Sequence, residues 1–158
     1  MLDRKNCLVT GATGGLGKEI AKQLLTNNCN LFLTAKNEKR LQKLKNELET
    51  YNHNKCKISY RSGNLSNLNH IKQIISKARK DLGSIDILIN CAGIFVSKPI
   101  SKSTLEDFQK VYDVNIRAPF LFCKEFSKDM IKKRWGRIIN MGSSSSYSGF
   151  KNGSIYCS

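Results

Sequence analysis

The sequence contains few acidic residues and no long apolar run. Aspartate and glutamate number 12 among its 158 residues, against 27 lysines and arginines, which gives a formal net charge of +15. A transmembrane helix needs about 20 consecutive apolar residues, and no segment approaches that length, so we expect no membrane partner. The N-terminal residues before the first apolar run contain no small-residue cleavage site, and we expect no secretory signal there.

No Cys-x-x-Cys pair occurs among the cysteines. They are spread along the whole chain, at Cys7, Cys29, Cys56, Cys91, Cys123 and Cys157. Spacing of this kind is typical neither of a zinc site nor of a compact disulfide framework. We therefore predict reduced thiols, no metal site and a cytoplasmic location.

The excess of positive charge has three explanations. A solvated, lysine-rich surface is the simplest, because the cations are mixed with acids, as in Glu38-Lys39-Arg40. A second is attraction of anionic ligands, such as a phosphorylated cofactor or an acidic carrier. The third, nucleic-acid binding, requires lysines and arginines gathered in a patch. Here they are scattered along helical faces, so we expect no nucleic-acid partner.

Short apolar runs alternate along the chain with longer segments of helical period. Strands are expected at Cys7–Val9, Leu31–Thr34, Lys57–Arg61, Ile85–Ile89 and Gly136–Asn140. Helices are expected from Leu16, over Leu41–Leu48, over Ile71–Ala78, and over Thr104–Lys133 with an interruption or kink at Pro119. A polar loop is expected over Ser143–Ser154. This alternation predicts an α/β fold with a doubly wound, Rossmann-like parallel sheet, in a single domain over residues 1–158.

A glycine-rich turn, Thr10-Gly11-Ala12-Thr13-Gly14-Gly15-Leu16-Gly17, joins the first expected strand to the first expected helix. Glycines let the backbone approach a pyrophosphate closely, and a helix N-terminus offers free N–H groups to an anion. The spacing does not fit Gly-x-Gly-x-x-Gly, because Ile20 stands where the third glycine would be. The candidate dinucleotide-binding residues of this turn are Thr10, Gly11, Thr13, Gly15, Leu16 and Gly17.

The turn fits Thr-Gly-x-x-x-Gly-x-Gly and so resembles the short-chain dehydrogenase/reductase family. Three further segments continue the resemblance in order: Asn90-Cys91-Ala92-Gly93, Val114-Asn115, and the strand that leads to Ser143, followed thirteen residues later by Tyr156. Together they cover essentially the whole chain. The family includes 3-oxoacyl-acyl-carrier-protein reductases, and the expected strand order is 3-2-1-4-5.

The resemblance implies hydride transfer between a nicotinamide cofactor and a carbonyl or alcohol carbon. By position, Tyr156 is the expected acid/base, Ser143 the residue that orients the substrate oxygen, and Asn115 the residue that holds a water of the proton relay. Further expected cofactor-binding residues are Lys36, Asn64, Leu65, Asn90, Ala92 and Gly93.

The end of the second strand carries Ala35 and Lys36, where an acid would favour NAD(H) and a base favours NADP(H). We therefore predict NADP(H) over NAD(H). Asn64 stands where relatives often carry aspartate. The substrate is expected to be a small carbonyl or alcohol compound or an acyl carrier protein, and the basic run Lys132–Arg134 is a hypothetical dock for an acidic carrier.

The sequence ends at Ser158, whereas the family places a lysine four residues after the tyrosine. We therefore expect a C-terminally truncated member, lacking further strands and the substrate-covering loop, with part of the Phe108–Met130 surface exposed. A non-catalytic nucleotide-binding fragment or regulator is the alternative. A full-length form is expected to be a homo-oligomer. His53 and His70 are interpreted as surface residues.

Overall fold

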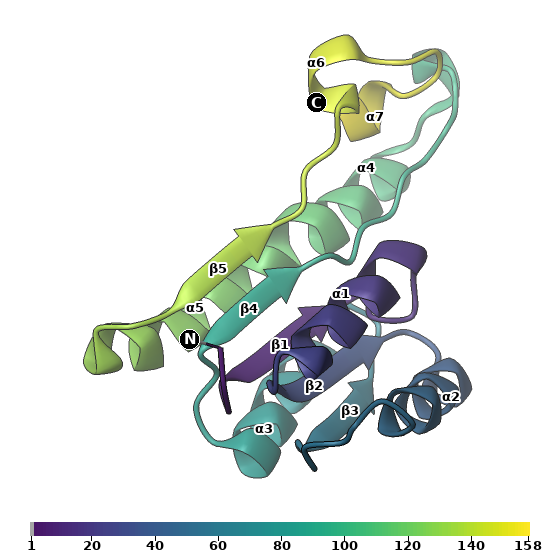
Figure 1. Cartoon of the computed structure of the whole chain (residues 1–158). Helices are drawn as coiled ribbons and strands as arrows, with labels where there is room; N and C mark the ends of the chain where they lie inside the picture. Colours follow the sequence, from purple (N-terminus) through teal and green to yellow (C-terminus); the bar gives the residue numbers. More distant parts are fainter. Residues whose placement is uncertain (1) are drawn as a thin grey trace.

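The structure is a computed structural model that describes residues 2–158. Five parallel strands form one sheet in the order β3-β2-β1-β4-β5, as Figure 1 shows. They are β1 (Asn6–Thr10), β2 (Asn30–Ala35), β3 (Ile58–Ser62), β4 (Ile87–Asn90) and β5 (Arg137–Asn140). The predicted doubly wound sheet and its strand order are confirmed. The order reverses between β1 and β4, and ligands of such sheets bind beyond the carboxyl ends of the strands at this point.

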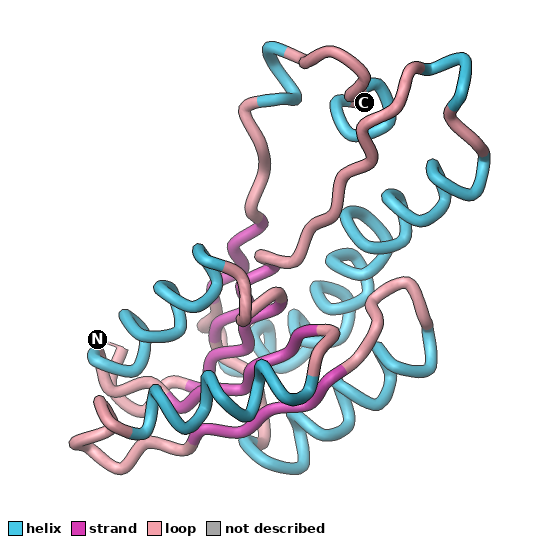
Figure 2. Tube along the Cα trace, turned by 90° about the vertical axis from the view of Figure 1, so that its right-hand side faces the viewer, coloured by secondary structure: helices cyan, strands magenta, loops and turns pink. Residues whose placement is uncertain are grey.

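Helices cover both faces of the sheet (Figures 1 and 2). One face carries α1 (Gly15–Thr26) and α2 (Glu38–Glu49), and the other carries α3 (Leu68–Leu82) and α5 (Ala118–Lys133). The predicted helices are present, and α3 ends at Gly83, whose positive φ of 79° suits a helix stop. A short 3-10 helix, η1 (Ile100–Lys102), precedes α4 (Leu105–Tyr112).

Alternate strand residues serve the two halves of the core. Cys7 and Val9 of β1 pack with α1 and α2, whereas Leu8 between them packs with α3 and α5. All three side chains are fully buried. Because side chains alternate across a strand, a parallel sheet covered on both faces needs apolar residues at successive positions. This is the physical basis of the short apolar runs in the sequence.

The long helix expected around Pro119 is divided by a π-helical turn, η2 (Asp113–Arg117), which joins α4 to α5. Pro119 is the second residue of α5, and the residue four positions before it, whose carbonyl a proline ring would meet in a regular helix, lies in the wider turn η2. The interruption expected at Pro119 therefore lies a few residues earlier, at Asp113–Arg117, and its form is a wider helical turn rather than a break. Such turns occur frequently at functional sites.

The polar segment expected as a loop is partly helical. It contains α6 (Ser145–Ser148), and α7 (Ser154–Cys157) begins at its end. Both helices lie in a piece that projects beyond the carboxyl ends of the strands (Figure 1). The prediction was wrong here because serine and glycine have weak helix propensity, while Gly149, with φ of 62°, allows the chain to turn between the two short helices.

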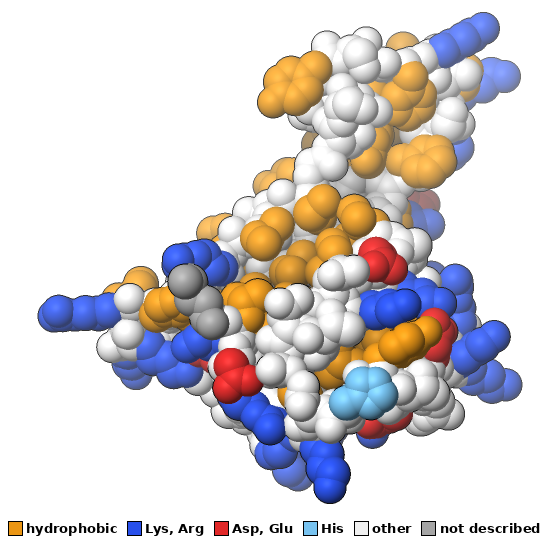
Figure 3. All heavy atoms as spheres, in the orientation of Figure 1, with side chains coloured by type: hydrophobic (Ala, Val, Ile, Leu, Met, Phe, Trp, Pro, Cys, Tyr) orange, Lys and Arg blue, Asp and Glu red, His pale blue; other side chains and the backbone are white. Residues whose placement is uncertain are grey.

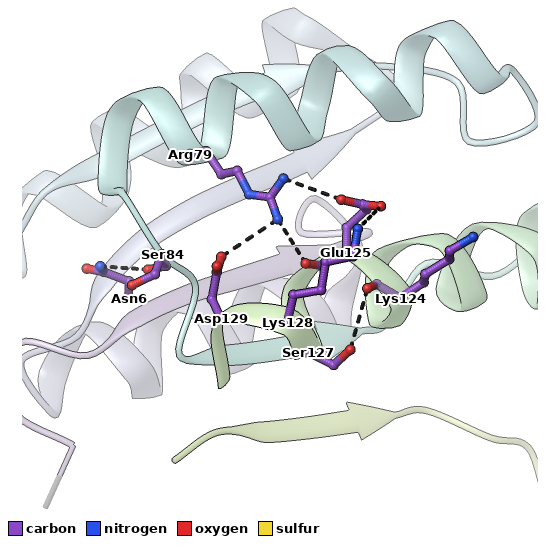
Figure 4. Close-up of polar contacts among 8 residues, drawn as sticks. All are labelled: Asn6, Arg79, Ser84, Lys124, Glu125, Ser127, Lys128 and Asp129. Atoms are coloured by element: carbon purple, nitrogen blue, oxygen red, sulfur yellow. Dashed lines mark hydrogen bonds and ion pairs between the residues drawn. The ribbon is translucent and has the colours of Figure 1, made fainter. Parts of the chain in front are cut away.

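A cluster of ion pairs joins α3 to α5 at the back of the sheet (Figure 4). Arg79 of α3 donates to the backbone oxygen of Glu125 at 2.8 Å and pairs with the carboxylates of Glu125 and Asp129 at 3.4 and 3.7 Å. Its guanidinium also lies 5.7 Å from the ring centroid of Phe126. The cluster fixes the spacing of the two helices that pack on this face.

A stripe of exposed apolar side chains follows α4, η2 and α5. Its members are Phe108, Tyr112, Ile116 and Phe120, which are 44 to 60% exposed. Residues four apart share one helix face, so the stripe is continuous, and the expected exposure within this segment is confirmed. Every residue of β5 is also exposed, and Figure 3 shows hydrophobic side chains on the face of the molecule that β5 presents in this view. Among the described residues, no helix has the length and apolarity needed to cross a membrane.

Candidate active site

Thr10 at the end of β1 ties two strands together. Its hydroxyl oxygen accepts from the backbone N–H groups of Cys91 and Ala92, at 3.1 and 3.0 Å, just beyond β4. The side chain is almost completely buried. Thr10 does not line either of the cavities described below, so its role is to hold the backbone that does.

Close backbone packing explains two of the glycines in the turn. Gly11 has φ of 65°, and a Cβ there would lie 2.7 Å from Cα of Ala92. A Cβ on Gly17 would lie 2.4 Å from the carbonyl oxygen of Gly11. Gly15, by contrast, has open space around it, and Leu16 beside it is 53% exposed. Gly15 and Leu16 lie in the first turn of α1, and neither lines the two cavities described below.

The turn forms one wall of a cavity of about 320 Å³ beyond the carboxyl ends of β1 and β2. Thr13 and Gly14 line it where α1 begins, and Gly14 caps that helix without any side-chain hydrogen bond. The first N–H groups of α1 therefore have no side-chain acceptor, as an anion site at a helix N-terminus requires. The predicted residues that line this cavity are Gly11, Thr13, Lys36, Asn64, Leu65, Ala92 and Gly93.

Two cations stand at the rim of this cavity, Lys36 after β2 and Arg40 in the first turn of α2. Arg40 also donates from Nη2 to the backbone oxygen of Thr13 at 3.4 Å, so it reaches from α2 to the glycine-rich turn. Among the lining residues, all within the described part of the chain, none is acidic. The cavity rim is therefore positively charged.

A second cavity, of about 610 Å³, adjoins the first and shares Ala92 and Gly93 with it. The three predicted catalytic residues all line it: Asn115 from η2, Ser143 after β5, and Tyr156 from α7. Each is half-buried. The ring of Tyr156 packs against Phe95 and Phe150, with centroid distances of 6.0 and 6.2 Å. Residues from distant parts of the sequence are thus brought to one cavity.

The side-chain amide of Asn115 makes two hydrogen bonds to one backbone residue, Ile94. Its Oδ1 accepts from the backbone N–H of Ile94 at 2.9 Å, and its Nδ2 donates to the backbone oxygen of Ile94 at 2.8 Å. Ile94 lines the smaller cavity. In this arrangement the amide holds the chain between the two cavities, and its second N–H and the second lone pair of its oxygen have no partner among the described residues.

Asn90 lines the larger cavity from the end of β4. Its Nδ2 donates to Oδ1 of Asn140 at 2.8 Å, which links β4 to β5. Its buried Oδ1 has no hydrogen-bond partner among residues 2–158. A buried acceptor without a donor is costly, and a hydroxyl or amide group of a ligand could satisfy it.

The thiols beside the cavities are poor nucleophiles. Burial raises the pKa of Cys91, which lines the smaller cavity, and of Cys123, which lines the larger one. Thiols with raised pKa stay protonated near neutral pH. Within the described range, no group of three or more His, Cys, Asp or Glu side chains could hold a metal ion. Hydroxyl groups also line the larger cavity, among them those of Ser143 and Tyr156.

The basic run Lys132–Arg134 lies at the other end of α5, away from the cavities. Lys133 pairs with the buried carboxylate of Asp86 at 2.7 Å, just before β4 begins. A helix of 16 residues is about 24 Å long, so this distance separates the run from the residues of α5 nearest the site. The run does not contribute to the walls of either cavity.

The sequence did not indicate two contacts, one made by a residue that lines the smaller cavity and one made by a residue that holds its wall. Arg40 looked like one of many helix-surface cations, and only its contact with Thr13 distinguishes it. His70 was interpreted as a surface residue, but it is half-buried and accepts a hydrogen bond from the backbone N–H of Asn64. His53 is exposed, as expected. The contacts Arg40–Thr13 and His70–Asn64 each join residues that do not belong to one sequence motif, so no local sequence pattern predicts them.

The strand order and the glycine-rich turn define a Rossmann-like α/β protein. The family model of the short chain dehydrogenases matches residues 5–158, so the chain belongs to this family, and the resemblance seen in the sequence is confirmed. A 3-oxoacyl-acyl-carrier-protein reductase of Rickettsia felis is 36% identical over 157 residues, covering 99% of this chain and 61% of the relative. Nodulation protein G of a Rhizobium species is 33% identical over 156 residues, covering 99% of this chain and 61% of that protein.

Solved structures are similar along the whole chain. A metagenomic short-chain oxidoreductase in complex with NADP superposes with a TM-score of 0.90 at 25% identity, covering 99% of this chain and 70% of that one. A metagenomic blue fluorescent protein in complex with NADPH gives a TM-score of 0.89 at 28% identity, covering 99% and 63%. The chain spans about three fifths of the length of the curated relatives named above.

Proposed function

We propose that this chain binds a nicotinamide dinucleotide, NADP(H) in preference to NAD(H), and supplies the acid/base residues of a carbonyl–alcohol oxidoreductase. The observation that carries the proposal is the convergence of Asn115, Ser143 and Tyr156 on one cavity that adjoins the cavity under the glycine-rich turn. We further propose that residues 1–158 act as a single dinucleotide-binding domain. The relatives that bind NADP or NADPH support the choice of cofactor.

The residues present fit such a cofactor. Gly11 and Gly17 keep the turn free of side chains where a Cβ would collide with backbone. The uncapped start of α1 suits a pyrophosphate, and the buried Oδ1 of Asn90 needs a donor. When bound, the cofactor supplies or accepts the hydride. Gly11, Thr13, Asn64 and the Ala92–Gly93 backbone would hold it.

The protein's own part in the reaction is proton transfer at the substrate oxygen. The phenol of Tyr156 would donate a proton to that oxygen during reduction and take it back during oxidation. The hydroxyl of Ser143 would donate a hydrogen bond to the same oxygen and orient it. Asn115 would fix Ile94 and thereby the junction of the two cavities.

The cofactor preference rests on charge. Lys36 and Arg40 stand at the rim of the smaller cavity without an acidic neighbour among its lining residues, and a cation there favours a 2′-phosphate, whereas an acid favours a 2′-hydroxyl. Fluorescence titration with NADPH and NADH measures the preference. We expect tighter binding of NADPH, and a Lys36→Ala variant in which the difference shrinks. Equal affinities in the unmodified chain would show that the preference is wrong.

For the substrate we propose a 3-oxoacyl thioester, presented by an acyl carrier protein, as the name of the Rickettsia relatives suggests. A different small carbonyl or alcohol compound is the alternative. Loss of absorbance of the reduced cofactor at 340 nm, with a 3-oxoacyl thioester as probe, measures turnover. We expect Tyr156→Phe to abolish turnover and to leave cofactor binding unchanged. Binding without turnover in the unmodified chain would favour a non-catalytic nucleotide-binding role.

A further inference from the structure

The loop after β3 forms the wall of the smaller cavity that faces away from β4. Gly63, Asn64 and Leu65 line the cavity here. The loop is tight, because Oδ1 of Asn64 accepts from the backbone N–H and the hydroxyl of Ser66, at 3.2 and 2.9 Å. These contacts are internal to the loop and do not fix its position relative to the sheet.

Two side chains outside the loop hold it in place. From α3, Nδ1 of His70 accepts from the backbone N–H of Asn64 at 3.1 Å. From η2, Nη2 of Arg117 donates to the backbone oxygen of Ser66 at 2.8 Å, and Arg117 is itself paired with the buried Asp113 at 2.7 Å. The loop is therefore tethered at both ends by side chains, and the backbone N–H of Gly63 also donates to the backbone oxygen of Ala35 at 3.0 Å. Of the two side-chain tethers, that of His70 is the one that reaches a residue lining the cavity.

The hydrogen bond to His70 is specific in its chemistry. A ring nitrogen accepts an N–H only when it carries no proton itself, so Nδ1 must be the unprotonated nitrogen of the imidazole. The ring is held in the required place by the start of α3, where Oδ1 of Asn67 caps the backbone N–H groups of Asn69 and His70 at 2.9 and 3.2 Å. The loop also lies close to this helix, since a Cβ on Gly63 would be 3.3 Å from Cβ of His70.

We propose that His70 is a positioning residue for the cofactor: its Nδ1 fixes the Asn64 backbone, so that the Gly63–Leu65 wall of the cavity is in place before the cofactor binds. The inference rests on the proposed dinucleotide function of this cavity. His70 does not line the cavity itself, so it acts on affinity through Asn64. Preorganisation raises affinity because the loop is already ordered, so binding does not include the entropy cost of ordering it.

The experiment compares NADPH dissociation constants, from fluorescence titration, for the unmodified chain, His70→Ala, His70→Asn and His70→Gln. One net hydrogen bond corresponds to roughly a 3- to 10-fold change, and we expect such an increase in Kd for His70→Ala. His70→Asn should restore binding, because its Oδ1 lies as many bonds from the backbone as Nδ1 does. His70→Gln moves the acceptor outward and should not restore it. The exposed His53→Ala is the matched control, with unchanged Kd.

A purely structural role would lower the unfolding midpoint of His70→Ala without this pattern of rescue. If the unmodified chain binds NADPH and the Kd of His70→Ala equals that of His53→Ala, the positioning role is overturned while the proposed function stands. A weakened His70→Ala that His70→Asn does not rescue overturns it as well. If the unmodified chain does not bind NADPH, the proposed function fails, and the nitrogen-15 shifts of the imidazole still report whether Nδ1 is the unprotonated acceptor.

Discussion

The double hydrogen bond to the Thr10 hydroxyl predicts a large effect from a substitution that hardly changes shape. Thr10→Val keeps the volume of the side chain and removes the hydroxyl oxygen that accepts from the backbone N–H groups of Cys91 and Ala92. A buried N–H left without an acceptor costs about 1–3 kcal/mol. Two such groups give a loss of about 2–6 kcal/mol, which is a large part of the roughly 5–15 kcal/mol by which a domain is stable.

A matched control lies beside it in the sheet. Thr34 of β2 is the register partner of Thr10 and is completely buried, but its hydroxyl has no hydrogen-bond partner among the described residues. Thr34→Val removes a buried polar group that makes no hydrogen bond in the structure, so we expect stability to stay the same or to rise. The same substitution on neighbouring strands should therefore give opposite results. Thr10→Ser keeps the acceptor and should lose far less than Thr10→Val.

Thermal and urea unfolding measure the difference. For a chain of this size a loss of 1 kcal/mol lowers the melting temperature by about 2–4 °C, so a loss of about 3 kcal/mol lowers it by roughly 6–12 °C in Thr10→Val. The affinity for NADPH should fall with it, because the Ala92 backbone belongs to both cavities. Equal melting temperatures for Thr10→Val and Thr34→Val would refute the reasoning.

Three further predictions follow from single contacts. Gly17→Ala should prevent tight packing of the turn, because its Cβ would lie 2.4 Å from the oxygen of Gly11; both unfolding midpoint and cofactor affinity should fall. Lys128 holds the pKa of Glu125 below its usual range. The ionised Glu125 therefore stabilises the folded state above the pKa that this group has in the unfolded chain, and this contribution is lost as the pH falls through its lower pKa in the folded protein. Urea unfolding at several pH values measures this: between about pH 5 and pH 3 the free energy of unfolding should fall less in Glu125→Gln than in the unmodified chain. Phe120→Gln should reduce binding of a hydrophobic dye with little change in melting temperature, because Phe120 is 60% exposed.

The sequence predicts the sheet well because the signals for it are local. Successive apolar residues such as Cys7, Leu8 and Val9 reflect burial on both faces of a strand, and Gly83 marks a helix end by its backbone conformation alone. The order of the strands came from the family resemblance rather than from these local patterns. The helix α6 was missed because none of its four residues, Ser145–Ser148, has strong helix propensity, and the packing between Phe150 and Tyr156 that follows it is tertiary.

The sequence predicted which residues lie at the site more completely than it predicted what each residue does there. Thr10 and Gly17 belong to the glycine-rich motif, yet one ties strands together and the other allows close packing, and neither lines a cavity. Gly11 both allows close packing and lines the cavity. A motif records which residue types the turn tolerates, and several different physical constraints give glycine at the same spacing. Only the distances to Ala92 and to the neighbouring backbone separate them.

The π-helical turn η2 links the two cavities structurally. Asn115 on this turn holds both backbone groups of Ile94, a residue of the smaller cavity, while itself lining the larger one. Arg117, two residues later, holds Ser66 in the loop on the far side of the smaller cavity. A regular α-helix would change the angular relation of residues on either side of the turn. The irregular turn therefore carries both the amide that holds Ile94 and the guanidinium that holds Ser66, and a change that affects one contact should be felt at the other.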